Sequence, residues 1–301
     1  MTSSRNKKLG GIIPAVITPF EESGVVREKD LQEQVSYLLS GGSHGFFVNG
    51  TTGEGGHLTT EEKLRIYKLV EEVSGDHAIL CAACIRPSTE MVVEEVKAFA
   101  QVEPDYIVAV TPYYYDVSQE VIYRHFKAVA EVASAPVIIY NIPSRTHNPI
   151  DMKTVRRLAD VENIVGIKDS TGNFTAFSMG MLSDFPEDFV WIQGEDLVDG
   201  PSLIIGAHGL VTGLSNILID PYVKMFDAAK AGNIAEVLEC QRTVNKLAEV
   251  IFVTGGQVNA SIKAAVSLLG RGTKWLRTPS LSLDDGDMAK VKAVLQQLEL
   301  L

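Results

Sequence analysis

Eight short apolar runs recur along the chain, and they constrain the fold more than any other feature of the sequence. Their apolar residues are continuous rather than alternating, which is typical of strands covered on both faces, as in a parallel sheet. Each run is followed by a longer stretch with helical spacing, and eight such units in about 220 residues predict a closed (β/α)8 TIM barrel, with an open doubly wound sheet as the alternative. The runs occupy residues 11–18, 45–49, 78–84, 105–110, 136–141, 163–168, 189–193 and 208–213.

The stretches between the apolar runs have the spacing of amphipathic helices. Leu31, Val35 and Leu38 fall at i, i+4 and i+7, so they share one face of a helix. Thr59 and Glu62 have the spacing of a capping box, which predicts that the next helix begins there. Helices of this kind are expected to cover the outside of the barrel.

The last part of the chain has a helical pattern but does not form a separate domain. Gly232 and Asn233 supply a helix stop after the eighth unit, and no linker rich in Pro, Gly or Ser follows them. We therefore predict a barrel over residues 1–232 and a helical extension over residues 233–301 that packs on it.

The composition excludes several classes of partner. The chain has 301 residues, of which 46% are hydrophobic, so it can bury a large core. It carries 27 Lys and Arg against 38 Asp and Glu, a net charge of −11, which repels nucleic acid and anionic lipid surfaces. No stretch approaches the roughly 20 apolar residues needed to span a bilayer. Neither nucleic acid nor a membrane is expected as a partner.

The cysteines and histidines indicate neither a redox pair nor a metal site. An odd count of three cysteines in a long chain suits a reducing compartment, so we predict a cytoplasmic location. Cys81 and Cys84 match a redox spacing, but in a strand they face opposite sides and are expected to be buried thiols. The six histidines show no HExxH or comparable spacing, so no metal is expected.

Lys168 ends the sixth apolar run, which makes it the most informative polar residue in the sequence. In a barrel the ends of the strands carry the chemistry, so Lys168 is expected to point into the mouth. Burial lowers the pKa of a lysine amine, and the neutral amine is a nucleophile that can form a Schiff base with a ketone. Other strand ends supply hydroxyl, phenol and guanidinium groups nearby.

Three short motifs supply the remaining groups that Schiff-base chemistry requires. The motif GTTGE at 50–54 offers hydroxyls and free backbone N–H groups that suit a small carboxylate. TPYYYD at 111–116 and YNIPSRT at 140–146 offer phenols that can transfer protons. Pro143 stiffens the turn that carries Arg145, whose guanidinium suits bidentate capture of a carboxylate.

Together with GIKDSTGN at 166–173, these motifs closely resemble the family of dihydrodipicolinate synthase and N-acetylneuraminate lyase, which are class I, pyruvate-binding aldolases. The resemblance covers essentially the whole chain. It implies a (β/α)8 barrel with three C-terminal helices, assembled as a dimer of dimers, and a reaction without a cofactor, because the Schiff base forms on a lysine.

The resemblance also implies a role for each residue of the site. Lys168 would form the iminium with pyruvate, Tyr140 would be the general acid and base, and Thr51 with Tyr114 would complete a proton relay. The tyrosine that matches Tyr114 crosses from the neighbouring subunit in the family. The expected substrate contacts are Thr52, Gly53, Arg145, Gly194 and Val211.

Three functions are compatible with these motifs. The first is a lyase that condenses pyruvate with aspartate 4-semialdehyde, which the arginine at position 145 favours. Glu195 and Asp196 could instead contact the hydroxyls of a sugar acid, which leaves a 2-keto-3-deoxy sugar-acid aldolase or dehydratase, or an N-acetylneuraminate lyase-like enzyme, as the second. The third is a non-catalytic barrel that senses a keto acid. Pro87 and Met91 stand where the family binds lysine, so feedback by lysine is not implied.

Overall fold

The computed structural model describes residues 7–301, which contain one sheet of eight parallel strands. Residues 1–6 of the segment predicted as barrel lie outside the described residues. Each predicted run overlaps one strand, which confirms the pattern of the sequence, and β6 extends one residue beyond its run, to Asp169. The strands are β1 (Gly11–Ile12), β2 (Gly45–Val48), β3 (Ile79–Cys84), β4 (Tyr106–Val110), β5 (Val137–Asn141), β6 (Ile164–Asp169), β7 (Val190–Gln193) and β8 (Gly209–Leu210).

The sheet closes on itself, so the barrel is confirmed over the open doubly wound sheet. The strand order is β1-β8-β7-β6-β5-β4-β3-β2. The two ends of this order meet where Ala15 bridges Phe47 in parallel, just beyond β1. The strand β1 is shorter than the predicted run 11–18, although beyond it the Ile13 and Ala15 N–H groups still donate to the carbonyls of Leu210 and Thr212 at 2.9 and 2.8 Å.

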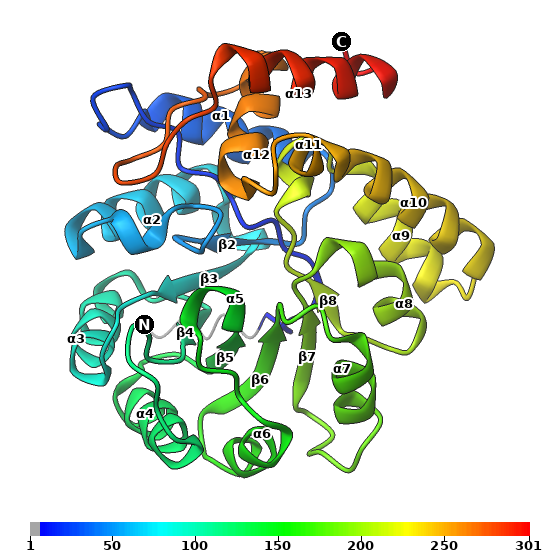
Figure 1. The fold of residues 1–301 in the computed structure, drawn as a ribbon. Helices are drawn as coiled ribbons and strands as arrows, with labels where there is room; N and C mark the ends of the chain where they lie inside the picture. The colour runs from blue at the N-terminus through cyan, green and yellow to red at the C-terminus, as the bar shows by residue number, and fades with distance from the viewer. Residues whose placement is uncertain (1–6) are drawn as a thin grey trace.

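Helices cover the outside of the barrel and extend beyond it (Figure 1). Those between the strands pack on the outer face of the sheet, while α10 to α13 follow the eighth unit, with α13 beside α12 at the top of the view. None of the helices in residues 7–301 is both long and apolar enough to cross a bilayer. The helices are α1 (Glu28–Ser40), α2 (Thr60–Ser74), α3 (Thr89–Phe99), α4 (Gln119–Val132), α5 (Pro143–Thr146), α6 (Met152–Ala159), α7 (Phe174–Met181), α8 (Asp199–Ile204), α9 (Asp220–Lys230), α10 (Ile234–Leu247), α11 (Glu249–Phe252), α12 (Val258–Leu268) and α13 (Asp285–Gln297).

The predicted helix start at Thr59 is confirmed in atomic detail. The Thr59 hydroxyl accepts a hydrogen bond from the Glu62 N–H at 3.2 Å, and the Glu62 carboxylate accepts one from the Thr59 N–H at 2.9 Å. This capping box satisfies two backbone donors that the first turn of α2 would otherwise leave unpaired.

Side chains of the strands form two separate apolar cores. The outer core lies between the sheet and the helices and includes Cys84, whereas the inner core fills the barrel and includes Cys81. Both thiols are buried and free, as expected for positions i and i+3 of one strand. Because the inner core is packed with apolar side chains, a polar group among them has to be positioned by its neighbours.

Candidate active site

Lys168 lies at the carboxyl end of β6, inside the mouth of the barrel. Its side chain is oriented by strand pairing, because Lys168 is the register partner of Tyr140 on β5. The residue is 4% exposed, and its amine lies 4.0 Å from the ring centroid of Tyr140 and 4.2 Å from that of Phe47. The predicted meeting of a buried amine and a phenol is thus present in the structure.

Gly194, after β7, leaves room beside this lysine. A Cβ atom at position 194 would lie 2.7 Å from the Cε of Lys168 and 2.2 Å from the hydroxyl oxygen of Ser170. Any side chain there would displace the amine, so only glycine is compatible with this arrangement. Val211, the other residue predicted on this side, is buried in the inner core together with Tyr140.

The loop after Lys168 is organised by the next residue of the strand, Asp169. Its carboxylate accepts hydrogen bonds from the hydroxyl of Thr171 at 2.6 Å, from the Thr171 N–H at 3.0 Å and from the Asn141 amide at 3.0 Å. Burial raises the pKa of Asp169, and these three donors lower it in part. Ser170 in turn donates to the Gly194 carbonyl at 2.9 Å, and its hydroxyl oxygen lies 3.5 Å from the Tyr140 phenol oxygen. The hydroxyls of this loop therefore fix the ends of β5, β6 and β7 around the amine.

The GTTGE loop after β2 carries three of the predicted site residues. Thr51 is half-buried, Thr52 is buried, and the Gly53 carbonyl accepts a hydrogen bond from the Thr18 hydroxyl at 2.8 Å. Glu54 then adopts a left-handed backbone with φ of 56°, a conformation that is unfavourable for a residue with a Cβ atom. Interactions of the Glu54 side chain offset this backbone conformation.

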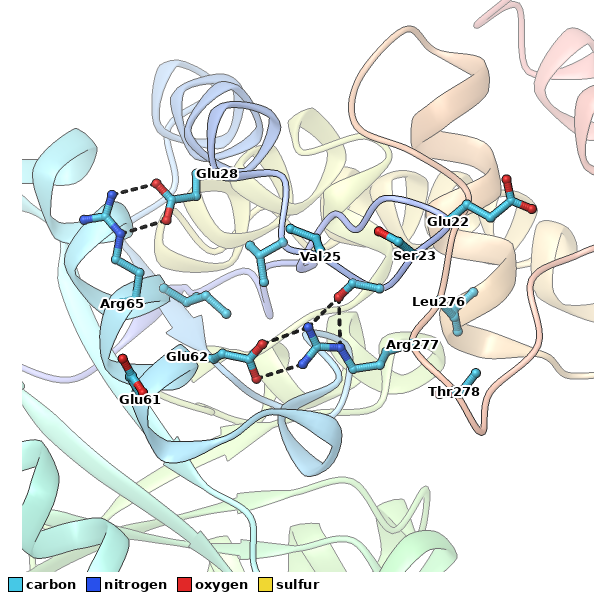
Figure 2. A pocket seen from close by; sticks show the side chains of 13 residues that line it. Glu22, Ser23, Val25, Glu28, Glu61, Glu62, Arg65, Leu276, Arg277 and Thr278 are labelled. Atoms are coloured by element: carbon cyan, nitrogen blue, oxygen red, sulfur yellow. Dashed lines mark hydrogen bonds and ion pairs between the residues drawn. The ribbon is translucent and has the colours of Figure 1, made fainter.

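Glu54 is held in place by Lys263, Arg277 and Glu62, and we call these four residues the loop anchor. The amine of Lys263 on α12 is fully buried and lies 2.6 Å from the Glu54 carboxylate. The Arg277 N–H donates to the other oxygen of that carboxylate at 2.9 Å. Figure 2 shows the Arg277 guanidinium bound to Glu62 of α2 through both carboxylate oxygens, at 2.8 and 2.9 Å. The C-terminal helices therefore support the loop that carries Thr51 and Thr52.

A cavity of about 590 Å³ opens between the GTTGE loop and the C-terminal segment. Thr51, Tyr113 and Arg145 line it on the barrel side, and Asn259 and Leu281 line it on the other. The Asn259 amide donates to the Thr51 carbonyl at 2.9 Å, which joins the two sides. Thus Thr51 and Arg145 share one cavity, as predicted from their positions at strand ends.

The structure does not bring Tyr114 to Lys168 within one chain. Tyr114 is 83% exposed, has φ of 83°, and contacts the ring of Tyr115 at 4.8 Å between centroids. The positive φ has an energetic cost of about 1–3 kcal/mol for a residue with a Cβ atom. Its neighbour Tyr113 lines the cavity instead.

A cluster of carboxylates lies beside the lysine at the end of β7. The Tyr222 phenol donates to the Asp196 carboxylate at 2.5 Å. Burial raises the pKa of Asp196, while the hydrogen bond from Tyr222 and the charge of Lys168 lower it in part. Asp199 is fully buried; burial and the charges of Asp196 and Glu195 raise its pKa well above its usual value. A raised pKa favours the protonated form, so this cluster limits the negative charge near the amine.

Several residues of the site were not predicted from the sequence. Phe47 is part of an unbroken apolar run, so nothing marked it as the ring beside the amine. Lys263 and Asn259 lie about 90 residues beyond Lys168 in a helix whose pattern looks structural. Ser170 was the most accessible to prediction, since its hydroxyl follows the strand end directly.

A buried lysine at a strand end, next to a phenol and a glycine, defines the protein as a (β/α)8-barrel enzyme of the Schiff-base lyase class. The chain belongs to the dihydrodipicolinate synthetase family, whose model matches residues 8–298.

Individual relatives agree with this assignment over nearly the whole chain. The 4-hydroxy-tetrahydrodipicolinate synthase of Chlorobaculum parvum is 34% identical over 297 residues, which cover 98% of this chain and 99% of the relative. The crystal structure of dihydrodipicolinate synthase from Aquifex aeolicus superposes with a TM-score of 0.91 at 30% identity, covering 97% of this chain and 99% of that one. The chloride-inhibited enzyme from Acinetobacter baumannii, complexed with pyruvate, superposes with a TM-score of 0.92 at 27% identity. The superposition covers 97% of this chain and 99% of that one.

Proposed function

We propose that the protein condenses pyruvate with aspartate 4-semialdehyde and so acts as a 4-hydroxy-tetrahydrodipicolinate synthase. The observation that carries the proposal is the Lys168 amine, buried at the strand end between the rings of Phe47 and Tyr140. The names of the relatives support the same reaction, and the pyruvate complex of the A. baumannii enzyme supports the first substrate.

The proposed chemistry begins when the amine of Lys168 attacks the ketone carbon of pyruvate. Loss of water gives an iminium, which is an electron sink and acidifies the adjacent methyl group. Removal of a methyl proton gives an enamine, whose carbon attacks the aldehyde while the aldehyde oxygen takes up a proton. We assign these proton transfers to Tyr140, and Ser170 lies within 3.5 Å of its phenol oxygen. The reaction proposed in this way needs no metal and no organic cofactor, because the covalent intermediate forms on the protein itself.

Carboxylates of the two substrates are assigned to different parts of the site. We assign the pyruvate carboxylate to Thr52, Gly53 and neighbouring N–H groups of the GTTGE loop. Arg145, which lines the cavity, is assigned to the carboxylate of the aldehyde. Gly194 and Val211 would shape the space around the reacting carbon.

Tyr114 supports a proposal about assembly. A tyrosine held in a positive-φ conformation and 83% exposed fits a phenol that enters the site of a neighbouring subunit and completes the relay with Thr51 there. We therefore propose a homo-oligomer, a dimer of dimers, in which each catalytic site is shared across one interface.

Location in the cytoplasm remains a prediction from the cysteine content.

A second substrate class is favoured by one specific observation. The amides of Gln257 and Asn259 line the cavity opposite Arg145, and Glu195 lies beside Gly194. Amide and carboxylate groups bind hydroxyls, so a 2-keto-3-deoxy sugar acid is the alternative substrate of the same lysine.

Trapping with borohydride tests the covalent step. Incubation with pyruvate and borohydride is expected to add one reduced pyruvyl group to Lys168, located by peptide mass spectrometry. Lys168→Arg should abolish the adduct, whereas Lys224→Arg, at an exposed lysine of α9, should leave it unchanged. An unmodified Lys168 in the wild-type protein would contradict the proposal.

A substrate panel tests the aldehyde. Purified protein is expected to consume pyruvate with aspartate 4-semialdehyde faster than it cleaves or dehydrates 2-keto-3-deoxy acids. The opposite order, with Lys168 still trapped by pyruvate, would assign the sugar-acid alternative.

A further inference from the structure

A separate cavity lies at the amino ends of the strands, opposite to the end of the barrel that carries Lys168. It has a volume of about 660 Å³, and we call it the basal pocket. His44, His77 and His208 line it, and each of them stands just before or within two residues of a strand, at β2, β3 and β8. The other lining residues are Lys7, Lys8, Leu9, Gly10, Gly11, Leu39, Ser43, Ala78, Ile79, Phe226 and Lys230.

The basal pocket is positively charged in a strongly negative protein. Three lysines and three histidines line it, and its described lining contains neither Asp nor Glu, although the chain carries a net charge of −11. Lys7 is paired with Asp105 at 3.0 Å. Within residues 7–301, Lys8 and Lys230 have no ion-pair partner, so their charges are available to a bound anion.

Backbone hydrogen bonds fix the tautomer of two of the histidines that line the pocket. The Ile12 N–H donates to Nδ1 of His44 at 3.1 Å, and the Trp191 N–H donates to Nδ1 of His208 at 3.1 Å. Since Nδ1 accepts in both rings, the proton of each neutral imidazole is on Nε2. Burial lowers the pKa of both histidines, so both rings are neutral donors at pH 7.

These donors lie on neighbouring elements. The His44 N–H donates to the Ile12 carbonyl at 2.8 Å, and the Gly11 N–H donates to the His208 carbonyl at 3.0 Å, so the two histidines flank β1 from either side. The His44 ring contacts Phe226 edge to face at 5.1 Å, and the Lys230 amine lies 4.4 Å from the centroid of that same ring. Gly11 permits this packing, because a Cβ atom there would lie 2.5 Å from the His44 ring.

We propose that the basal pocket binds the dianion of a small phosphate monoester through the amines of Lys8 and Lys230 and the Nε2 donors of His44 and His208. Lysine amines bind phosphate as point charges, whereas planar carboxylates are matched by guanidinium groups, and no arginine is among the described lining residues. A tetrahedral phosphate has three terminal oxygens that can accept from several directions at once. Leu9, Leu39, Ile79 and Phe226 would contact the apolar body of the ester.

Calorimetric titration tests this site, with phenyl phosphate and inorganic phosphate as phosphate probes and benzoate and phthalate as carboxylate probes. At fixed ionic strength we expect phenyl phosphate to bind more tightly than inorganic phosphate, because its ring is buried, and more tightly than either carboxylate. Lys8→Gln and Lys230→Gln should each weaken phenyl phosphate binding about tenfold, the loss of one charge-assisted hydrogen bond. Lys224→Gln removes an exposed lysine from the same helix as Lys230, outside the pocket, and should leave binding unchanged.

Three outcomes would overturn the proposal: no binding of phenyl phosphate, equal binding of phenyl phosphate and phthalate, or unchanged binding in both Lys8→Gln and Lys230→Gln. The two lysines are exposed, so their variants are expected to fold, which a thermal melt verifies. The basal pocket and the lysine site lie at opposite ends of the strands, so pyruvate trapping on Lys168 reports on the proposed function independently of this result.

Discussion

Replacing Lys263 with methionine tests how far the C-terminal helices stabilise the catalytic loop. Lys263 is fully buried, its amine lies 2.6 Å from the Glu54 carboxylate, and burial lowers its pKa to about 8, so the amine is still charged at pH 7. Methionine keeps most of the apolar stem of the lysine but removes the cation that pairs with Glu54. The Glu54 carboxylate is itself only 1% exposed. Breaking a buried ion pair by removing one partner costs about 3–5 kcal/mol. Because the Arg277 N–H still donates to Glu54 at 2.9 Å, we expect a loss of about 3 kcal/mol.

The chain offers a matched control in Lys63→Met. Lys63 is equally buried and lies 2.7 Å from Glu95, but Glu95 has a second cation, Arg86, at 2.6 Å. The carboxylate therefore stays paired in this variant, and we expect a loss of about 1–2 kcal/mol. Urea denaturation at pH 7 measures the free energy of unfolding of both variants. Borohydride trapping, under conditions where both variants are folded, measures the rate at which pyruvate is trapped on Lys168.

Two results would refute the reasoning about the loop anchor. The first is an equal loss of stability in the two variants, because the second cation of Glu95 would then have no effect. The second is a folded Lys263→Met protein that is trapped by pyruvate at the wild-type rate, because Glu54 directly follows the residues assigned to the pyruvate carboxylate. Lys63→Met should leave the trapping rate unchanged.

Three further predictions concern single residues. Arg145→Ala should slow turnover of aspartate 4-semialdehyde at least tenfold and leave pyruvate trapping near the wild-type rate; equal losses in both assays would exclude its assignment to the second substrate. Mixing inactive Lys168→Arg with Tyr114→Phe should restore about a quarter of wild-type activity if Tyr114 acts across the interface. Half of the random dimers are then mixed, and one of the two sites in each mixed dimer is complete. No gain on mixing would mean that Tyr114 acts within its own chain. His125 is buried with a pKa lowered from 6.5 to about 4, so the unfolded chain binds a proton between these pH values that the folded chain excludes. The contribution of His125 to the free energy of unfolding is complete above pH 6.5 and falls by about 3 kcal/mol by pH 4. His125→Gln should therefore flatten the acid limb of a curve of stability against pH. An unchanged limb would contradict the lowered pKa.

The fold was predictable because parallel strands leave a strong local signal. Strands covered on both faces must be apolar throughout, so each of the eight was visible in its own run of residues. Strand ends were less predictable: the run at 11–18 contains a strand of only two residues, and Ala15 pairs with Phe47 only as an isolated bridge. Closure of the barrel depends on contacts between distant segments and has no local pattern.

The candidate site was predictable where chemistry follows a strand directly. Lys168 and Tyr140 are the second-last residues of β6 and β5, Gly194 directly follows β7, and parallel pairing of these neighbouring strands brings such residues together. Phe47 and Lys263 were not predictable, because an aromatic residue in an apolar run and a lysine in a helix have commoner structural roles. The exposure and the positive φ of Tyr114 were not predictable, because a run of tyrosines does not reveal them.

The hydrogen bond from Asn259 to the Thr51 carbonyl has a consequence for engineering this enzyme. Helix α12 forms part of the wall against which the second substrate would lie, while the reacting amine belongs to a strand about 90 residues earlier. Exchanging the lining residues Gln257, Asn259 and Leu281 for those of a relative, with Lys263 and Arg277 kept, would therefore alter aldehyde preference and leave the covalent step intact. A barrel truncated after residue 232 would lose this wall together with the loop anchor.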